Sequence, residues 1–226
     1  METINCFGHQ LVLEHCNHRD YYDNPDVASA VERIFSLPEI HNRERGANWD
    51  SHHGEGATSE VNPYLGPEHI SGAKELIHWI KEQCFHALKL YNIDGTSIEI
   101  TRSWMNQMNY KSQGRCHQHT GINQENYQPI KMNYGDSPTT YSYDLVETPD
   151  LVAIFYVSNQ PNGSSLVVVK DGVFGQLPSD MEESNKYYIL PQSGDLIIHQ
   201  PEVWHGVSEH NSQTPRVCFA FHIKAK

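Results

Sequence analysis

The second half of the chain consists of short apolar runs separated by turn signals, and this pattern constrains the fold more than any other feature. Asn-Gly at 162–163, Asp-Gly at 171–172 and Ser-Gly-Asp at 193–195 interrupt the runs. Many short runs with this spacing predict an antiparallel sandwich or barrel. The predicted strands are residues 97–104, 108–110, 141–146, 151–158, 164–170, 187–190, 195–199, 203–208 and 216–223.

The first third of the chain has a different pattern. Apolar residues from Val27 to Phe35 repeat with helical spacing until Pro38, and a longer apolar stripe runs from Ala73 to Leu88 with Ser71 as its expected N-cap. The polar stretch 42–67 reads as a loop. We therefore expect a single domain, 1–226. A helical and loop segment, 1–96, would support a mainly β core, 97–226.

Composition restricts the classes of protein to which this chain can belong. The chain has 226 residues, enough to bury a core, and a formal net charge of −12 without a cluster of Lys and Arg, which disfavours duplex nucleic acid as a partner. No stretch approaches the ~18 consecutive apolar residues of a membrane span. The five cysteines are odd in number and contain no Cys-x-x-Cys motif, so they do not suggest a disulfide framework or a zinc ribbon. The N-terminal sequence shows no evident signal peptide. We expect a cytoplasmic location.

Three histidines and an arginine form the most informative set of polar residues. His117 and His119 lie two positions apart, and His205 returns in a later predicted strand. Alternate residues of a strand share a face, about 6.6 Å apart, so this pair and a histidine from a neighbouring strand can converge on one ion. Neutral imidazole suits iron, zinc, copper or nickel. Arg216, eleven positions after His205, would hold an anionic co-substrate.

Residues 97–226 resemble the Fe(II)- and 2-oxoglutarate-dependent oxygenases. The resemblance rests on Ser103-Trp104-Met105-Asn106, His117-Gln118-His119, Gly194-Asp195-Leu196-Ile197-Ile198, Trp204-His205-Gly206-Val207 and Arg216. It implies a double-stranded β-helix, or jelly-roll barrel, with flanking helices and a mononuclear iron site. The implied cofactors are Fe(2+), the co-substrate 2-oxoglutarate and dioxygen. His117, His119 and His205 would be the metal ligands, and Arg216 and Tyr156 would contact 2-oxoglutarate. No catalytic residue beyond the metal ligands is implied.

The chain departs from this family at one position. In most members the first motif is His-x-Asp or His-x-Glu, whereas the acidic position here is His119. Three neutral imidazoles leave the metal charge uncompensated until the dianionic co-substrate binds, so the empty site should hold iron more weakly. Asp136, Asp144 and Glu147 are alternative carboxylate ligands outside the motif. Halogenating members have a small residue at this position, and the large His119 disfavours that reaction.

The expected function is that of a dioxygenase that hydroxylates an unidentified small molecule or protein side chain, with succinate and carbon dioxide as co-products. One alternative is a three-histidine, cupin-like dioxygenase without 2-oxoglutarate, which His119 favours and Arg216 disfavours. Another is a non-catalytic jelly-roll module that binds a ligand or a structural zinc. His199 and His222 are interpreted as packed or exposed strand residues. Segments 118–140 and 42–67 are expected to carry substrate specificity.

Overall fold

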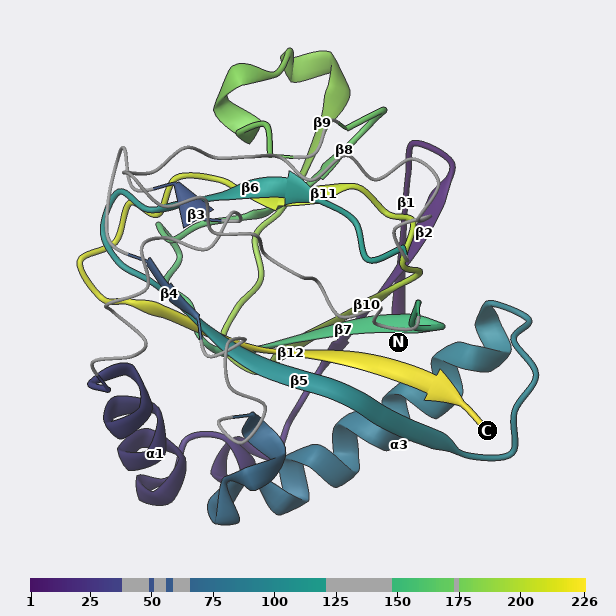
Figure 1. The fold of residues 1–226 in the computed structure, drawn as a ribbon, viewed down its shortest axis with the longest axis vertical. Helices are drawn as coiled ribbons and strands as arrows, with labels where there is room; N and C mark the ends of the chain where they lie inside the picture. The colour runs from purple at the N-terminus through teal and green to yellow at the C-terminus, as the bar shows by residue number, and fades with distance from the viewer. Residues whose placement is uncertain (38–48, 51–55, 59–65, 121–147, 173–174) are drawn as a thin grey trace, which may run out of the picture.

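The computed structural model describes residues 1–37, 49–50, 56–58, 66–120, 148–172 and 175–226. In this part of the chain two antiparallel sheets face each other, and helices α1 and α3 cover the outer face of the larger sheet (Figure 1). This arrangement confirms the predicted jelly roll with flanking helices.

The larger sheet has the strand order β1-β2-β10-β7-β12-β5-β4. Its strands, in chain order, are β1 (Glu2–Cys6), β2 (His9–His15), β4 (Gly56–Thr58), β5 (Ile98–Met108), β7 (Leu151–Ser158), β10 (Asp195–His199) and β12 (Arg216–Ala225). The smaller sheet has the order β3-β6-β11-β8-β9. Its strands are β3 (Trp49–Asp50), β6 (Gln113–His117), β8 (Leu166–Val169), β9 (Lys186–Ile189) and β11 (His205–Val207).

The two long helices form where the apolar spacing predicts them. Helix α1 (Pro25–Phe35) begins at Asn24, whose side chain accepts a hydrogen bond from the backbone N–H of Val27. Helix α3 (Lys74–Leu90) differs from the prediction at its start, because Ser71 lies in a preceding 3-10 turn and the N-cap residue is Ala73, whose side chain accepts no hydrogen bond. The short 3-10 helices are η1 (Arg19–Tyr21), η4 (Pro67–His69), η5 (Ser71–Ala73), η7 (Pro178–Asp180) and η8 (Glu183–Asn185).

Strand β12 separates the two cores of the molecule. Phe219 and Phe221 belong to the cluster between the larger sheet and the helices, whereas Cys218 belongs to the cluster between the sheets. Side chains of a strand alternate between its faces. The even-numbered residues of β12, from Arg216 to His222, therefore face the space between the sheets.

The structure also differs from the sequence prediction in the strands. Residues 1–15 form the β1–β2 hairpin, which extends the larger sheet through β10, although no strand is predicted before Ser97. The run 108–110 is no separate strand, since Met108 is the last residue of β5. The predicted strand 141–146, the carboxylates Asp136, Asp144 and Glu147, and most of segments 42–67 and 118–140 lie outside the described residues.

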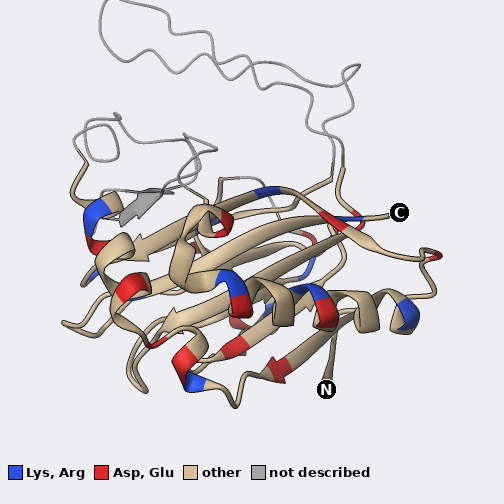
Figure 2. Cartoon of the chain, turned by 90° about the horizontal axis from the view of Figure 1, so that it is seen from below, with Lys and Arg blue, Asp and Glu red and all other residues tan. Residues whose placement is uncertain are grey.

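Charges are interspersed over the described part of the chain. Figure 2 shows Lys and Arg alternating with Asp and Glu along the helices and strands, without a basic stripe on the face in view. No helix in this part is long and apolar enough to cross a membrane.

Candidate metal centre

Two strands of the smaller sheet bring the first two histidines together. His117 is the last residue of β6 and His205 the first of β11, and the two are direct cross-strand partners. Their ring centroids lie 4.4 Å apart. The register of this sheet therefore brings together two residues that are far apart in the sequence.

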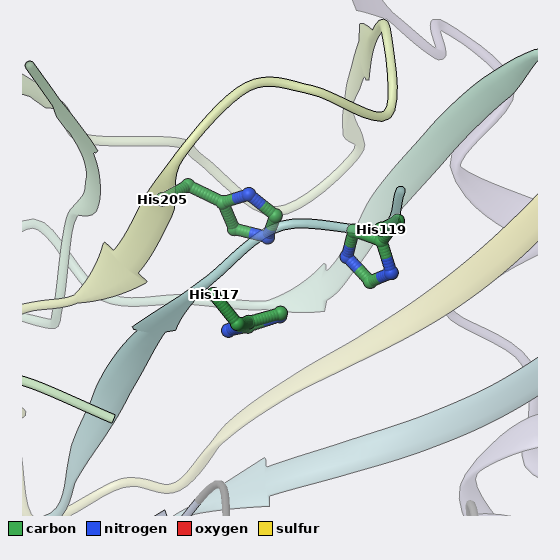
Figure 3. A group of neighbouring side chains, drawn as sticks. All are labelled: His117, His119 and His205. Atoms are coloured by element: carbon green, nitrogen blue, oxygen red, sulfur yellow. The ribbon is translucent and has the colours of Figure 1, made fainter. Parts of the chain in front are cut away.

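His119 reaches the same place from beyond the end of β6. Its backbone N–H donates to the carbonyl oxygen of Pro201, 2.8 Å away, which ties the segment after β6 to the segment before β11. One ring nitrogen from each of His117, His119 and His205 lies within 4.8 Å of the others, and Figure 3 shows the three side chains grouped around one space. The predicted set comes together, but through this backbone bond rather than through alternation along one strand.

Hydrogen bonds determine which nitrogen each ring offers. Nδ1 of His117 lies 2.9 Å from the carbonyl oxygen of Arg115, and Nδ1 of His205 lies 3.0 Å from that of Val203. A carbonyl oxygen only accepts, so each Nδ1 carries the proton and Nε2 is the nitrogen with the lone pair. Nδ1 of His119 is in contact with another imidazole, Nε2 of His222, at 2.8 Å.

The environment keeps His119 and His205 neutral. Burial lowers the pKa of both well below the usual value for histidine, and the neighbouring imidazoles lower it further. Only a neutral imidazole can bind a metal. These two rings are therefore in the protonation state that a metal requires at neutral pH.

Two histidines of the larger sheet complete the cluster. His199 in β10 and His222 in β12 both pair with Val152 of β7, so the three lie in one row across the sheet. Both are buried. The His199 ring lies 4.7 Å from the His205 ring, and the His222 ring lies 4.9 Å from the His119 ring. Strand alternation in the sequence allows His199 and His222 to face inward. It does not reveal which of the three candidate metal-binding histidines each of them would contact.

His199 resembles the candidate ligands in its hydrogen bonding. Its Nδ1 lies 2.7 Å from the carbonyl oxygen of Gln200, and its buried Nε2 has no partner among the described residues. Burial lowers the pKa of His199 to about 4 and that of His222 to about 3. Both rings are therefore neutral at pH 7.

The same inter-sheet space contains a buried cation. Arg216 is 2% exposed, and its Nη1 contacts Ser164 Oγ at 3.2 Å and Met108 Sδ at 3.1 Å. Its guanidinium lies 4.8 Å from the ring centroid of Tyr156. No carboxylate in the described part of the chain pairs with Arg216. A buried, unpaired charge is unfavourable, so this position fits an anionic ligand.

Unsatisfied polar atoms lie near this arginine. Arg216 Nε, Tyr156 Oη and Asn106 Oδ1 are buried and have no hydrogen-bond partner among the described residues. Burial raises the pKa of Tyr156, so its hydroxyl remains a donor. A ligand with carboxylate oxygens would accept from the arginine and the tyrosine.

The donor set fits a transition metal. Three imidazole nitrogens suit iron, nickel, copper or zinc, whereas calcium and magnesium prefer oxygen. Among the described residues, no carboxylate or thiolate joins this group. The structure thus offers a site for a metal and, in the same inter-sheet space, a site for an anion.

One family model matches the C-terminal part of the chain. Residues 149–222 match the family described as "Putative 2OG-Fe(II) oxygenase". No curated protein sequence matches the chain.

Several solved structures share the fold at low identity. HygX from Streptomyces hygroscopicus, with nickel, 2-oxoglutarate and hygromycin B bound, has a TM-score of 0.54 at 13% identity, covering 96% of this chain and 83% of HygX. A Pseudomonas putida prolyl-4-hydroxylase has a TM-score of 0.57 at 13% identity, covering 96% and 94%. The 2-oxoglutarate-dependent epimerase SnoN from nogalamycin biosynthesis has a TM-score of 0.53 at 10% identity, covering 95% and 77%.

Proposed function

We propose that this chain, which belongs to the superfamily of Fe(II)- and 2-oxoglutarate-dependent oxygenases, hydroxylates an organic substrate. The observation that carries the proposal is that the space between the sheets contains both three converging imidazoles and a buried arginine without a carboxylate partner among the described residues. Bound there, iron and 2-oxoglutarate supply oxidative chemistry in which dioxygen gives one oxygen atom to the substrate and one to succinate, with loss of carbon dioxide.

The histidines have the task of holding the metal. His117, His119 and His205 would bind it through Nε2, since Nδ1 of each ring is already in a hydrogen bond. Three histidine ligands would leave further coordination positions of the metal open for a co-substrate. Because an imidazole ligand carries no negative charge, the negative charge at the centre would come from the co-substrate rather than from these side chains.

Arg216 and Tyr156 have the task of orienting the co-substrate. The guanidinium would pair with the distal carboxylate of 2-oxoglutarate, and the tyrosine hydroxyl would donate to the same molecule. Both groups are buried, so water does not compete for these contacts. The protein contributes binding, orientation and exclusion of water, while the metal and co-substrate carry the oxidation.

The proposed substrate is defined by class. HygX was solved with hygromycin B, and another structure of the same fold is a prolyl-4-hydroxylase, so we propose a small molecule or a protein side chain. The proposed location is the cytoplasm, because all five cysteines are buried free thiols.

Visible absorption of the anaerobic iron-loaded protein tests the proposal. Addition of 2-oxoglutarate should produce a weak metal-to-ligand band in the wild type, weakened in Arg216→Ala, and His119→Ala should lose iron. Oxygen consumption that requires 2-oxoglutarate and releases succinate should accompany it. Oxygen consumption without 2-oxoglutarate would support a three-histidine cupin-like enzyme. Zinc binding without oxygen consumption would support a binding module.

A further inference from the structure

His222 occupies a special position on strand β12. It lies on the same face of the strand as Arg216, six residues later, and is 6% exposed. One face of one strand thus carries the proposed anchor for the co-substrate and a histidine directed at the metal cluster. Across the sheet, Val152 separates His222 from His199.

The contact between His222 and His119 is specific. Nε2 of His222 lies 2.8 Å from Nδ1 of His119, and the two rings meet edge to face with their centroids 4.9 Å apart. Trp104 packs against both, with its ring 5.0 Å from His222 and 6.0 Å from His119. The pair is therefore restrained by an indole as well as by its own hydrogen bond.

This hydrogen bond differs from those of the other two candidate ligands. The Nδ1 partners of His117 and His205 are carbonyl oxygens, which can only accept. An imidazole nitrogen can accept or donate. If His222 Nε2 accepts, His119 carries its proton on Nδ1 and offers the Nε2 lone pair to the metal. If His222 donates, the proton of neutral His119 lies on Nε2, which then cannot coordinate.

The remaining nitrogen of His222 supports a role for this contact. Nδ1 of His222 is buried and has no hydrogen-bond partner among the described residues. When His222 Nε2 accepts, neutral His222 carries its own proton on Nδ1, which is then a buried donor without a partner and lowers stability. The hydrogen bond to His119 is the contact that accounts for a polar ring at this interior position.

We propose that His222 is a positioning residue that holds His119 in the orientation and tautomer that present Nε2 to the metal. This inference rests on the proposed metal site. It implies that His222 takes the role that backbone carbonyls have for His117 and His205. Removal of such an outer partner typically weakens metal affinity about 10- to 100-fold.

Cobalt(II) binding tests the inference without turnover. Each histidine bound through Nε2 shows an exchangeable, paramagnetically shifted Nδ1–H proton resonance, so the wild type should show three, from His117, His119 and His205. His222→Leu should bind cobalt about 10- to 100-fold more weakly and lose or broaden one resonance. The amide oxygen of the glutamine in His222→Gln can accept in place of Nε2, so this variant should restore both the cobalt affinity and the third resonance.

Phe221→Leu is the matched control, since it changes a buried side chain next to His222 that packs on the helix-covered face of β12, away from His119. Circular dichroism and thermal melting verify folding of each variant. Unchanged affinity and three resonances in His222→Leu would overturn the inference, as would failure of folded His222→Gln to restore them. An equal loss in Phe221→Leu would attribute the effect to packing of β12. A wild type that binds cobalt but shows no response to 2-oxoglutarate would instead contradict the proposed function.

Discussion

His117 and His205 are direct cross-strand partners at the end of β6 and the start of β11, with ring centroids 4.4 Å apart. Their spacing is therefore fixed by the backbone register of the smaller sheet rather than by side-chain flexibility. Any change that shifts β11 relative to β6 should act on the metal site as well as on stability.

Gly206 provides a test of this coupling. A Cβ at Gly206 would lie 2.9 Å from Pro178 Cγ, 3.0 Å from Cys116 Sγ and 3.0 Å from the carbonyl oxygen of Gly114. We expect Gly206→Ala to lower the free energy of unfolding by about 1–3 kcal/mol, because the strand next to His205 must move. Isothermal titration should show weaker nickel binding.

Gly8→Ala is the comparison for that experiment. Gly8 has a φ of +82° and open space around a Cβ, so alanine there strains the β1–β2 turn without a clash. It should lower stability while nickel affinity stays at the wild-type value. Equal loss of nickel affinity in both variants would contradict the link between β11 and the site.

Tyr156→Phe should weaken co-substrate binding without lowering the stability of the metal-free protein. The buried Tyr156 hydroxyl has no partner among the described residues, so its removal should leave the metal-free protein equally stable or more stable. The same change should weaken 2-oxoglutarate binding about 5- to 10-fold, because one hydrogen bond is lost. Chemical denaturation and titration of the iron-loaded protein measure the two effects.

Tyr91→Phe is the matched control for Tyr156. The Tyr91 hydroxyl lies 3.0 Å from the carbonyl oxygens of both Gln10 and Ile198. Its removal should lower stability and leave 2-oxoglutarate affinity unchanged. Wild-type affinity in Tyr156→Phe would exclude a contact between this hydroxyl and the co-substrate.

Metal and 2-oxoglutarate should strengthen each other's binding. Three neutral imidazoles do not compensate the charge of a divalent metal, whereas a dianion does. We expect nickel affinity to rise about 5- to 150-fold with saturating 2-oxoglutarate, and 2-oxoglutarate affinity to rise by the same factor with nickel. Arg216→Ala should reduce the affinity for 2-oxoglutarate. Calorimetry that finds identical nickel affinity with and without 2-oxoglutarate would argue against a shared site.

Acid should begin to destabilise the metal-free protein near pH 6.5, which is higher than the pH at which carboxylates take up protons. Burial lowers the pKa of His199 to about 4, against an ordinary value of 6.5. Below pH 6.5 the unfolded chain binds a proton that the folded chain does not, so stability falls with pH until the folded pKa is reached. His199 alone should contribute roughly 3 kcal/mol to this loss.

Urea unfolding between pH 7 and pH 4 measures that effect. His199→Phe removes one of the buried histidines with a lowered pKa and should make the profile less steep, while His119, His205 and His222 still contribute to the loss. A wild-type profile that is level across this range would show that His199 takes up protons in the folded state.

The sequence by itself determined the strands with strong apolar runs and the identity of the main polar set. The predicted bounds of β7 and β10 agree with the structure because each strand contains an uninterrupted apolar run, residues 151–157 in β7 and 196–198 in β10, and turn signals lie close to these runs. The β1–β2 hairpin was missed, since its apolar residues are few and it is stabilised mainly by pairing with β10. The spacing of His117, His119 and Arg216 identified these residues, because short motifs are local.

Tertiary structure alone decided how those residues meet. The Pro201 carbonyl positions His119, and the shared neighbour Val152 places His199 and His222 in one row beside the cluster. Strand alternation predicts a face but not the neighbouring strand or its register. Those depend on hydrogen bonds between segments that are distant in the sequence. For this reason the contact between His222 and His119 is visible only in the folded protein.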